Sequence, residues 1–235
     1  MCLVDLDSQN DISISFNVDA EKLDYTITEC LLDNVPVEKS LYKYSDNLDL
    51  LLSNARLEDY EFDVLTDPKK MIGYQTLLQE KLKPLYGKYD YIIVDSSPSF
   101  SILTVQMYML NAENGLTTDI IIPFQPELYA LKNLVRQINK VNKFKKMNDS
   151  LNIKAVIPTK TQANNTHKMI MTQIKQMLSA SDILVTDTQI RNSIKFTEYM
   201  LINQKPLALE EDSKLNKEYK QFKDIYVELL KELDL

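Results

Sequence analysis

The sequence predicts an α/β protein with a mostly parallel sheet flanked by helices. Short, continuously apolar runs alternate with longer amphipathic segments, a pattern typical of parallel strands joined by helices. Several of the apolar runs end in polar residues, and open parallel sheets bind their ligands at that end of the strands. The chain has 235 residues, 44% of them hydrophobic, so it can bury one substantial core. We therefore expect a single domain over residues 1–235.

The strands are expected where the apolar runs are short. They are predicted at residues 2–5, 48–52, 91–95, 119–124, 153–157 and 183–185. Most of these runs do not alternate, which predicts strands buried on both faces. The most polar connection, residues 53–70, is expected to be a peripheral excursion.

The helices are expected where apolar residues recur at helical spacing. A helix is predicted over residues 131–144, with Lys and Arg on the rest of its turn. Another should begin near Ile102, and residues 215–233 repeat the apolar spacing. The last segment is predicted to be a helix that docks on the domain and closes it.

The charge is divided unevenly along the chain. The net charge is −7, but residues 1–67 hold 16 acidic and 4 basic residues, a balance of −12. Residues 131–175 hold 10 Lys or Arg and one Asp, a balance of +9. The basic segment indicates either a surface that faces a polyanion or a set of solvated helix faces.

Cysteine and glycine usage excludes several kinds of site. Cys2 and Cys30 lack metal-ligand spacing and are predicted to be small buried residues. The three glycines, Gly73, Gly87 and Gly115, lie too far apart to form a phosphate-binding loop. No run of about 18 apolar residues and no signal-peptide pattern is present, which predicts a cytoplasmic protein.

Three predicted strand ends carry unusual polar residues. The first reads Asp-Leu-Asp-Ser-Gln from Asp5, the second Asp-Ser-Ser-Pro-Ser from Asp95, and the third Pro-Phe-Gln-Pro-Glu from Pro123. A buried strand that ends in Asp is typical of a Walker B element, whose carboxylate holds Mg²⁺ near nucleotide phosphates. A single such Asp is also common in ordinary turns. The order of the motifs along the chain must therefore decide between a nucleotide site and a simple turn.

The ordered motifs resemble those of the ParA family of DNA-segregation ATPases, the deviant-Walker relatives of MinD. The matching segments are MCLVDLDSQN, LDLLLSNARLEDYE, YDYIIVD with the Ser-Ser-Pro-Ser that follows it, IIIPFQPELYALKNLVRQI and IRNSIKFTEYMLINQKPL. The resemblance implies a P-loop NTPase fold whose first strand, Walker A loop and first helix are missing from this sequence. In the family that strand lies beside the strands of Asp5 and Asp95. A truncated gene, a start chosen too late, or a pseudo-ATPase without the loop would each explain this.

The resemblance also implies a site for ATP and Mg²⁺. Asp5 and Asp95 correspond to the residues of the magnesium shell, and Asp7 to the residue that orients or deprotonates the attacking water. The nucleotide-binding positions are Gln9, Pro158 and Thr159. Turn formation at a strand end is the alternative for the aspartates, and a plain Pro turn is the alternative for Pro158. Ser8, Asn10 and Ser97 depart from the family pattern.

The same resemblance implies partners. Arg191 falls at an arginine that the family uses for non-specific DNA contact, and Lys195, Arg136 and Lys140 would add phosphate contacts. A solvated surface arginine is the alternative for Arg191. A second copy of the chain and a ParB-like centromere-binding protein are the expected protein partners.

Two functions remain open at this point. The first is a plasmid or chromosome partition protein, cytoplasmic and nucleoid-associated, that dimerises with ATP, although this chain as written is expected to be defective in ATP binding. The alternative is a non-catalytic, ParA-like regulator or interaction protein. Membrane binding of the MinD kind is disfavoured because the final segment, VELLKELDL, is acidic.

Overall fold

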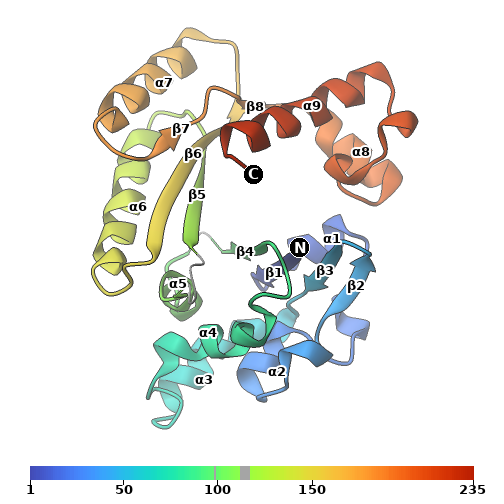
Figure 1. Ribbon diagram of the computed structural model, residues 1–235, viewed down its shortest axis with the longest axis vertical. Coiled ribbons are helices and arrows are strands. Elements are labelled where there is room, and N and C mark those ends of the chain that lie inside the picture. Colours follow the sequence, from blue (N-terminus) through green and yellow to red (C-terminus); the bar gives the residue numbers. More distant parts are fainter. Residues whose placement is uncertain (98, 112–116) are drawn as a thin grey trace. The chain divides into compact units, whose positions relative to one another are not determined.

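The computed structural model describes residues 1–97, 99–111 and 117–235 and forms two compact units, Met1–Asn111 and Ala112–Leu235 (Figure 1). Each unit contains a sheet with mostly parallel strands and helices packed against it. The predicted α/β class with a mostly parallel sheet is therefore confirmed.

The first unit has a sheet in the order β2-β3-β1-β4. Its strands are β1 (Cys2–Leu6), β2 (Tyr42–Ser45), β3 (Leu48–Leu51) and β4 (Ile92–Ser96). Its α-helices are α1 (Asp11–Ser15), α2 (Ile27–Leu32), α3 (Tyr60–Thr66), α4 (Leu77–Leu82) and α5 (Ile102–Tyr108). Short 3-10 helices complete the unit: η1 (Ala20–Lys22), η2 (Val37–Lys39), η3 (Ala55–Asp59), η4 (Tyr74–Thr76) and η5 (Lys83–Leu85). β1 pairs in parallel with both β3 and β4, so it is the central strand of this sheet.

Apolar side chains cover both faces of this central strand because side chains alternate along it. Val4 and Leu6 point to a cluster that includes Tyr60, while Leu3 packs on a second cluster with Phe16. Asp5 shares the parity of Leu3, so it lies on the second face of the sheet. This alternation places one carboxylate inside an otherwise apolar layer.

The second unit has a sheet in the order β5-β6-β7, and β8 pairs with the far end of β6. The strands are β5 (Thr118–Phe124), β6 (Leu151–Thr161), β7 (Leu184–Val185) and β8 (Ile190–Arg191). The helices are α6 (Ala130–Lys145), α7 (Asn165–Leu178), α8 (Lys195–Asn203) and α9 (Lys217–Glu232), with 3-10 helices η6 (Leu207–Leu209) and η7 (Asp212–Lys214). The predicted docking role of the last helix is confirmed within this unit, because Leu229 and Leu233 pack on Ala155 and Ile157 of β6.

Four expectations need correction. β2 is antiparallel to β3 and was not predicted, because its YKYS sequence is largely exposed and lacks an apolar run. Residues 53–70 are not only a polar excursion, since α3 buries Tyr60 and Val64 in the core. β4 is not buried on both faces, since Ile93 is 48% exposed. β1 already has β3 and β4 as neighbours, so no further strand fits beside β1.

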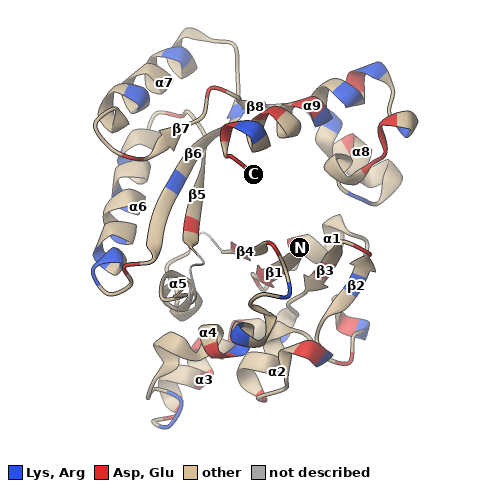
Figure 2. Ribbon diagram, viewed as in Figure 1, with Lys and Arg blue, Asp and Glu red and all other residues tan. Residues whose placement is uncertain are grey.

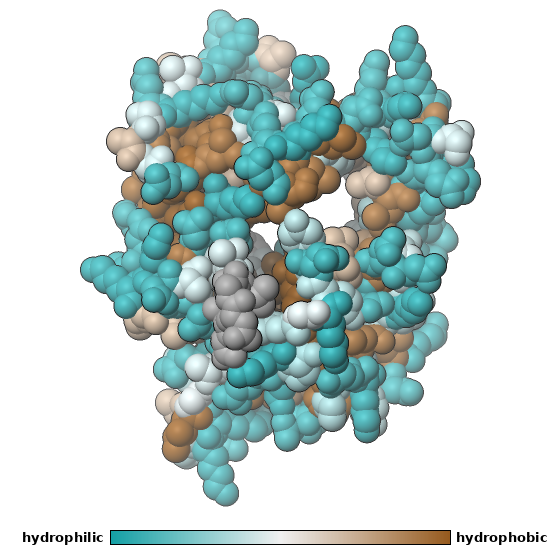
Figure 3. All heavy atoms as spheres, in the orientation of Figure 1, coloured by the Kyte–Doolittle hydropathy of each residue, from teal (hydrophilic) through white to brown (hydrophobic). Residues whose placement is uncertain are grey.

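Large apolar side chains also reach the solvent in the first unit, among them Phe62 and Ile72. Figure 3 shows apolar patches among mostly hydrophilic atoms on the face drawn. Within the described part of the chain, no helix is both long enough and apolar enough to cross a bilayer.

Candidate functional site

The candidate site of the first unit lies where β1 and β4 end. The two strands run in parallel, and their register places Asp5 opposite Asp95 and Leu6 opposite Ser96. Residues paired in register on neighbouring parallel strands point to the same face of the sheet. The structure therefore brings together the two carboxylates that the sequence predicted as magnesium ligands. Asp5 is buried and Asp95 is exposed, so the pair reaches from the core to the surface.

Asp5 is the buried member of this pair, with only 1% of its surface exposed. One carboxylate oxygen, Oδ1, accepts a hydrogen bond from the Asp7 N–H group at 3.0 Å. The other oxygen, Oδ2, has no hydrogen-bond partner among the described residues. Burial raises the pKa of Asp5 to about 6; the Asp7 N–H and Ser53 hydroxyl groups lower the pKa, and the Asp95 charge raises it further. An ionised, buried oxygen without a donor is a position that a cation would stabilise.

The residues after Asp5 form a compact loop, which we call the carboxylate loop and define as residues 5–10. Asp7 repeats the arrangement of Asp5, because its Oδ1 accepts the Gln9 N–H group at 3.0 Å. Asn10 ends the loop in the left-handed region, with φ 56° and ψ 33°, and precedes α1. Asn can adopt this conformation more readily than most residues. Asp7 is half-buried and Gln9 is exposed, so the loop presents both side chains toward solvent.

Ser53 holds this loop from the neighbouring strand, and the sequence reasoning missed it. It follows β3, is fully buried, and its Oγ lies 2.5 Å from the Asp7 carbonyl oxygen and 2.7 Å from Asn10 Oδ1. The available signal was the LDLLLSN segment, in which a Ser and an Asn directly follow an apolar strand. Because β3 and β1 are parallel neighbours, their carboxyl ends meet at the same edge of the sheet.

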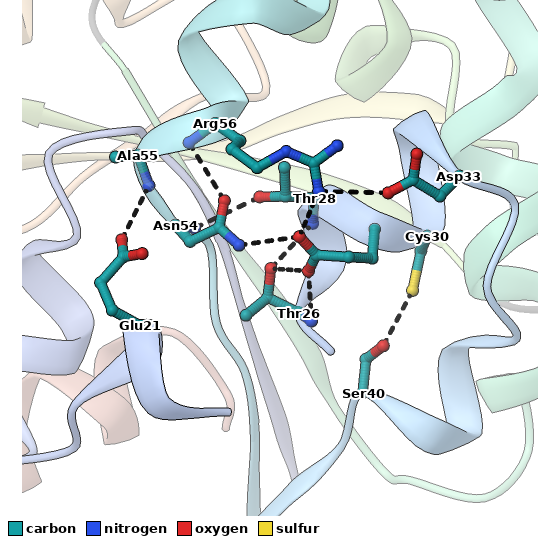
Figure 4. Close-up of polar contacts among 10 residues, drawn as sticks. Glu21, Thr26, Thr28, Cys30, Asp33, Ser40, Asn54, Ala55 and Arg56 are labelled. Atoms are coloured by element: carbon teal, nitrogen blue, oxygen red, sulfur yellow. Dashed lines mark hydrogen bonds and ion pairs between the residues drawn. The ribbon is translucent and has the colours of Figure 1, made fainter. Parts of the chain in front are cut away.

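A polar network fixes the segment that contains Ser53 to the start of α2 (Figure 4). Asn54 donates from Nδ2 to Glu29 Oε1 at 2.9 Å, and its N–H group donates to Thr28 Oγ1 at 3.2 Å. Arg56 adds a 3.0 Å ion pair to the same Glu29 oxygen. The second oxygen of Glu29 accepts the Thr26 N–H and hydroxyl groups, both at 2.7 Å, which completes a capping box. Glu29 thus connects the α2 N-terminus to the end of β3.

A small pocket of about 130 Å³ adjoins the carboxylate loop within the first unit. Asp7 and Ser8 line one side of it, and Ser97, Ser99 and Ser101 line another. Glu58 and Glu61, from the η3–α3 segment, are among its other lining residues. The pocket is therefore polar and lies beside the ends of β1 and β4.

The donors of this site fit a magnesium ion that relies on few protein ligands. In the described part of the chain, no group of three or more His, Cys, Asp or Glu side chains is arranged to hold a metal. Mg²⁺ keeps several waters and commonly uses one or two carboxylates together with substrate phosphates. Asp5, with its unpartnered oxygen, and Asp95 match this requirement.

The two predicted nucleotide-binding residues of the second unit, Pro158 and Thr159, lie near the end of β6. Pro158 pairs in register with Phe124 of β5, and Thr159 Oγ1 lies 3.4 Å from the Phe124 carbonyl oxygen. Thr159 is also opposite Ile190, and β8 continues directly to Arg191. The structure therefore brings Thr159 and Arg191 to the same strand end.

The basic residues of the second unit lie on two different elements. Arg136 and Lys140 lie on α6, where Figure 2 shows Lys and Arg and no acidic residue. Arg191 is exposed on β8. Lys195, at the start of α8, forms ion pairs with Glu198 at 3.1 Å and Glu218 at 3.7 Å. Lys195 is therefore already paired with two carboxylates.

A mostly parallel sheet with carboxylates at neighbouring strand ends is typical of open α/β proteins that bind a ligand at the carboxyl edge of the sheet. The family model described as "AAA domain" matches residues 1–153. The chain belongs to this family and is of the ParA type within the MinD/ParA superfamily.

Curated relatives agree with this assignment. An uncharacterized protein of Mycobacterium tuberculosis is 29% identical over 202 residues, which cover 83% of this chain and 59% of that protein. A ParA family protein of Mycoplasma pneumoniae is 23% identical over 241 residues, 98% of this chain and 84% of that protein. The chain spans 59% of the length of the Mycobacterium tuberculosis relatives that it matches.

Solved structures share the fold. A complex of a Cyanothece McdA variant with ATP has a TM-score of 0.78 at 18% identity, over 100% of this chain and 85% of that chain. A plasmid partition protein of Borrelia burgdorferi has a TM-score of 0.66 at 24% identity, over 98% and 84% of the two chains. Cobyrinic acid a,c-diamide synthase of Mycobacterium smegmatis, with bound ADP and magnesium, has a TM-score of 0.66 at 23% identity, over 86% and 82%.

Proposed function

We propose that this chain is a ParA-type partition protein of the kind that uses Mg²⁺ and ATP to control binding to DNA, and that residues 1–235, which contain no glycine-rich phosphate-binding loop, are defective in ATP binding. The observation that carries the proposal is the buried, unpartnered oxygen of Asp5, placed in register with Asp95 at the end of two parallel strands. A buried carboxylate oxygen without a donor is costly, and proteins retain such groups where a ligand compensates for them. The structural neighbours that hold ATP, or ADP with magnesium, support a nucleotide as that ligand.

The residues of the site have distinct roles in this proposal. Asp5 and Asp95 hold the metal shell, and Asp7, half-buried beside them, orients the attacking water. Mg²⁺ supplies positive charge that offsets the charge of the phosphates. Gln9, which is exposed on the carboxylate loop, would contribute to nucleotide binding. Pro158 and Thr159 remain predicted nucleotide-binding residues, and we keep the prediction that residues 1–235 act as one nucleotide-binding domain.

Two kinds of partner follow from the family and from the charges. The α6 helix carries five Lys or Arg and no acidic residue, which suits non-specific contact with DNA phosphates. A second copy of the chain would form the ATP-dependent dimer, and a ParB-like centromere-binding protein would stimulate hydrolysis. A protein with these partners would be cytoplasmic and associated with the nucleoid.

The metal site can be tested by titrating the full chain with Mn²⁺, with and without ATP, and following free Mn²⁺ by electron paramagnetic resonance. Asp5→Asn and Asp95→Asn should each weaken Mn²⁺ binding about tenfold or more, because each removes a charged ligand. Asp90→Asn, an exposed substitution just before β4, is the matched control and should bind as the unmodified chain does.

Equal Mn²⁺ affinity in all four proteins would contradict the site, and circular dichroism would establish that each variant is folded. If Asp95→Asn weakens Mn²⁺ binding and Asp5→Asn does not, Asp5 is not part of the metal shell.

A further inference from the structure

The carboxylate loop has little support of its own. Its internal hydrogen bonds are short-range: Asp7 N–H to Asp5, Gln9 N–H to Asp7 Oδ1, and Asn10 N–H to the Asp7 carbonyl oxygen at 3.3 Å. Such side-chain-to-backbone turns compete with other local arrangements and contribute only modestly to order. A contact from another element is needed to select one conformation.

Ser53 provides that contact. Its hydroxyl group touches both ends of the second half of the loop, the Asp7 carbonyl oxygen at 2.5 Å and Asn10 Oδ1 at 2.7 Å. The side chain is fully buried, so water does not compete for these acceptors. The hydroxyl group has one proton, which it shares between these two acceptor oxygens, so it links the backbone at Asp7 to the side chain that ends the loop.

Ser53 is itself held in place. The next residue, Asn54, is bonded to Thr28 and Glu29 at the start of α2, and Arg56 pairs with Glu29 (Figure 4). On the other side, Ser53 follows β3, which is paired with β1. The hydroxyl group is therefore fixed relative to the sheet and the helix, and the loop adjusts to it.

We propose that Ser53 is a positioning residue for the metal and phosphate site, because its buried hydroxyl group fixes the carboxylate loop and thereby orients the Asp7 carboxylate beside Asp5. This inference rests on the proposed function, which assigns the metal and phosphate site. Ser53 touches neither metal nor nucleotide in this scheme. It acts through the backbone of Asp7 and through Asn10, and its hydroxyl group also lies close enough to the Asp5 carboxylate to interact with it.

Loss of the hydroxyl group has a specific consequence. Without it, the one hydrogen bond to the Asp7 carbonyl oxygen that remains among the described residues is the 3.3 Å contact from the Asn10 N–H group, and the Asn10 side chain loses its contact with the buried Ser53. The loop then samples several conformations in which the Asp7 carboxylate points differently. The ligand binds only one of these loop conformations. The apparent affinity is therefore reduced to the fraction of the protein that adopts the binding conformation.

The test compares three variants of the full chain. Ser53→Ala removes the hydroxyl group. Asn10→Gly removes the second acceptor and keeps a residue suited to the left-handed backbone of this position. Ser40→Ala is the matched control, because Ser40 is another buried serine of this unit whose hydroxyl contacts the Cys30 sulfur at 3.2 Å, away from the loop.

Two quantities are measured for each variant: amide hydrogen exchange of Asp7 and Gln9, and the Mn²⁺ affinity. Ser53→Ala should speed exchange of both amides and weaken Mn²⁺ binding, each about fivefold to tenfold, the size expected for one net hydrogen bond. Asn10→Gly should act in the same direction with a smaller effect, because the Ser53 contact to Asp7 remains. Ser40→Ala should change neither quantity relative to the unmodified chain.

The outcomes separate this inference from the proposed function. If the unmodified chain binds no Mn²⁺ but Ser53→Ala still loosens the loop selectively, the metal site is wrong and the anchoring role of Ser53 stands. If Mn²⁺ binds and Ser53→Ala matches Ser40→Ala in both measurements, the positioning role is overturned. Should Ser53→Ala fail to fold, unchanged exchange and affinity in Asn10→Gly would overturn it instead.

Discussion

At the scale of residues, the described part of the chain buries two carboxylates, Asp5 and Glu210, in very different surroundings. Glu210 is 5% exposed and well partnered: Tyr199 donates to it at 2.6 Å and Lys205 pairs with it at 2.8 Å. These partners lower its pKa to about 2. Asp5 is 1% exposed, has one oxygen without a partner, and its pKa is raised by burial. Glu210 is therefore a structural ion pair, whereas Asp5 is suited to binding a cation.

The raised pKa of Asp5 predicts how stability depends on pH in the absence of metal. The folded chain holds the Asp5 proton up to about pH 6, whereas an unperturbed Asp releases it near 3.8. The folded state binds more protons in this interval, so the Asp5 contribution to the free energy of unfolding falls as the pH rises from about 4 to about 6. Above that range the ionised group costs up to about 3 kcal/mol.

Asp5→Asn should remove this dependence. The unfolding free energy of Asp5→Asn, minus that of the unmodified chain, should increase by up to about 3 kcal/mol between pH 4 and pH 7. Urea unfolding in the presence of a chelator, at several pH values, measures it. Asp90→Asn serves as the control. A difference that stays constant across this pH range would mean that Asp5 is not an uncompensated buried acid.

At the scale of elements, the start of α2 and the end of β3 form one connected unit through Glu29. The contacts of Glu29 are unequal, because the Thr26 end is buried and the Arg56 guanidinium is 53% exposed. Exposed ion pairs contribute little to stability, whereas a capping side chain satisfies backbone N–H groups that otherwise lack partners.

Thr26→Ala and Arg56→Ala should therefore differ in cost. Thr26→Ala breaks the capping box, in which Thr26 Oγ1 accepts the Thr28 N–H group at 3.2 Å, and should lower the unfolding free energy by about 1 kcal/mol or more. Arg56→Ala should cost no more than about 0.5 kcal/mol. Chemical denaturation of the two variants side by side measures the difference. A larger loss for Arg56→Ala would show that the guanidinium, and not the cap, fixes this end of α2.

The elements that were predicted from sequence share one property, which is a continuous apolar run. β1, β3 and β5 lie within a few residues of their predicted ranges. Strands that are buried in a parallel sheet consist of continuous apolar residues, so the sequence indicates them directly. β2 and β8 are short and lack an apolar run. They are strands because they pair with β3 and β6. α3 was missed because two buried residues, Tyr60 and Val64, stand in an acidic segment.

The candidate site could be predicted from sequence only in part. The structure places Asp5, Asp7 and Asp95 where two parallel strands end, as the sequence predicted, and such strand ends are where open α/β proteins bind ligands; the metal and water roles of these residues stay predictions. The role of Ser53 could not be found, because its acceptors lie 46 and 43 residues away in sequence. Only the pairing of β3 with β1 brings the hydroxyl group to the loop.

At the scale of the whole molecule, the charge is divided between the two units. Residues 1–111 contain 9 basic and 19 acidic residues, a balance of −10. Residues 112–235 contain 18 basic and 15 acidic residues, a balance of +3. Any contact with DNA is therefore expected through the second unit, whose net charge is of the opposite sign to that of DNA phosphates.

DNA binding should weaken with salt, and two basic residues should differ in their share of this effect. Arg191→Gln should reduce the magnitude of the slope of log K against log salt by about 1, the value for one phosphate contact. Lys195→Gln should change it much less, because Lys195 is paired with Glu198 and Glu218. Fluorescence anisotropy with a labelled duplex over a range of KCl concentrations gives both slopes.

A control for this titration is Lys70→Gln in the acidic first unit, which should leave the slope unchanged. Equal slopes for the Arg191 and Lys195 variants would mean that ion pairing on α8 does not decide which cations meet DNA.

The register of β1 against β4 has a consequence for folding. A slip by one residue would place Leu6 opposite Asp95 and turn Asp5 toward the other face of the sheet. Such a misfolded sheet would retain its hydrogen bonds but would lose the pair of carboxylates. A cation that binds only the correct pair stabilises, by mass action, only the chains whose strands are correctly aligned. In this protein the ligand would therefore act as a check on strand alignment, in addition to any part it takes in chemistry.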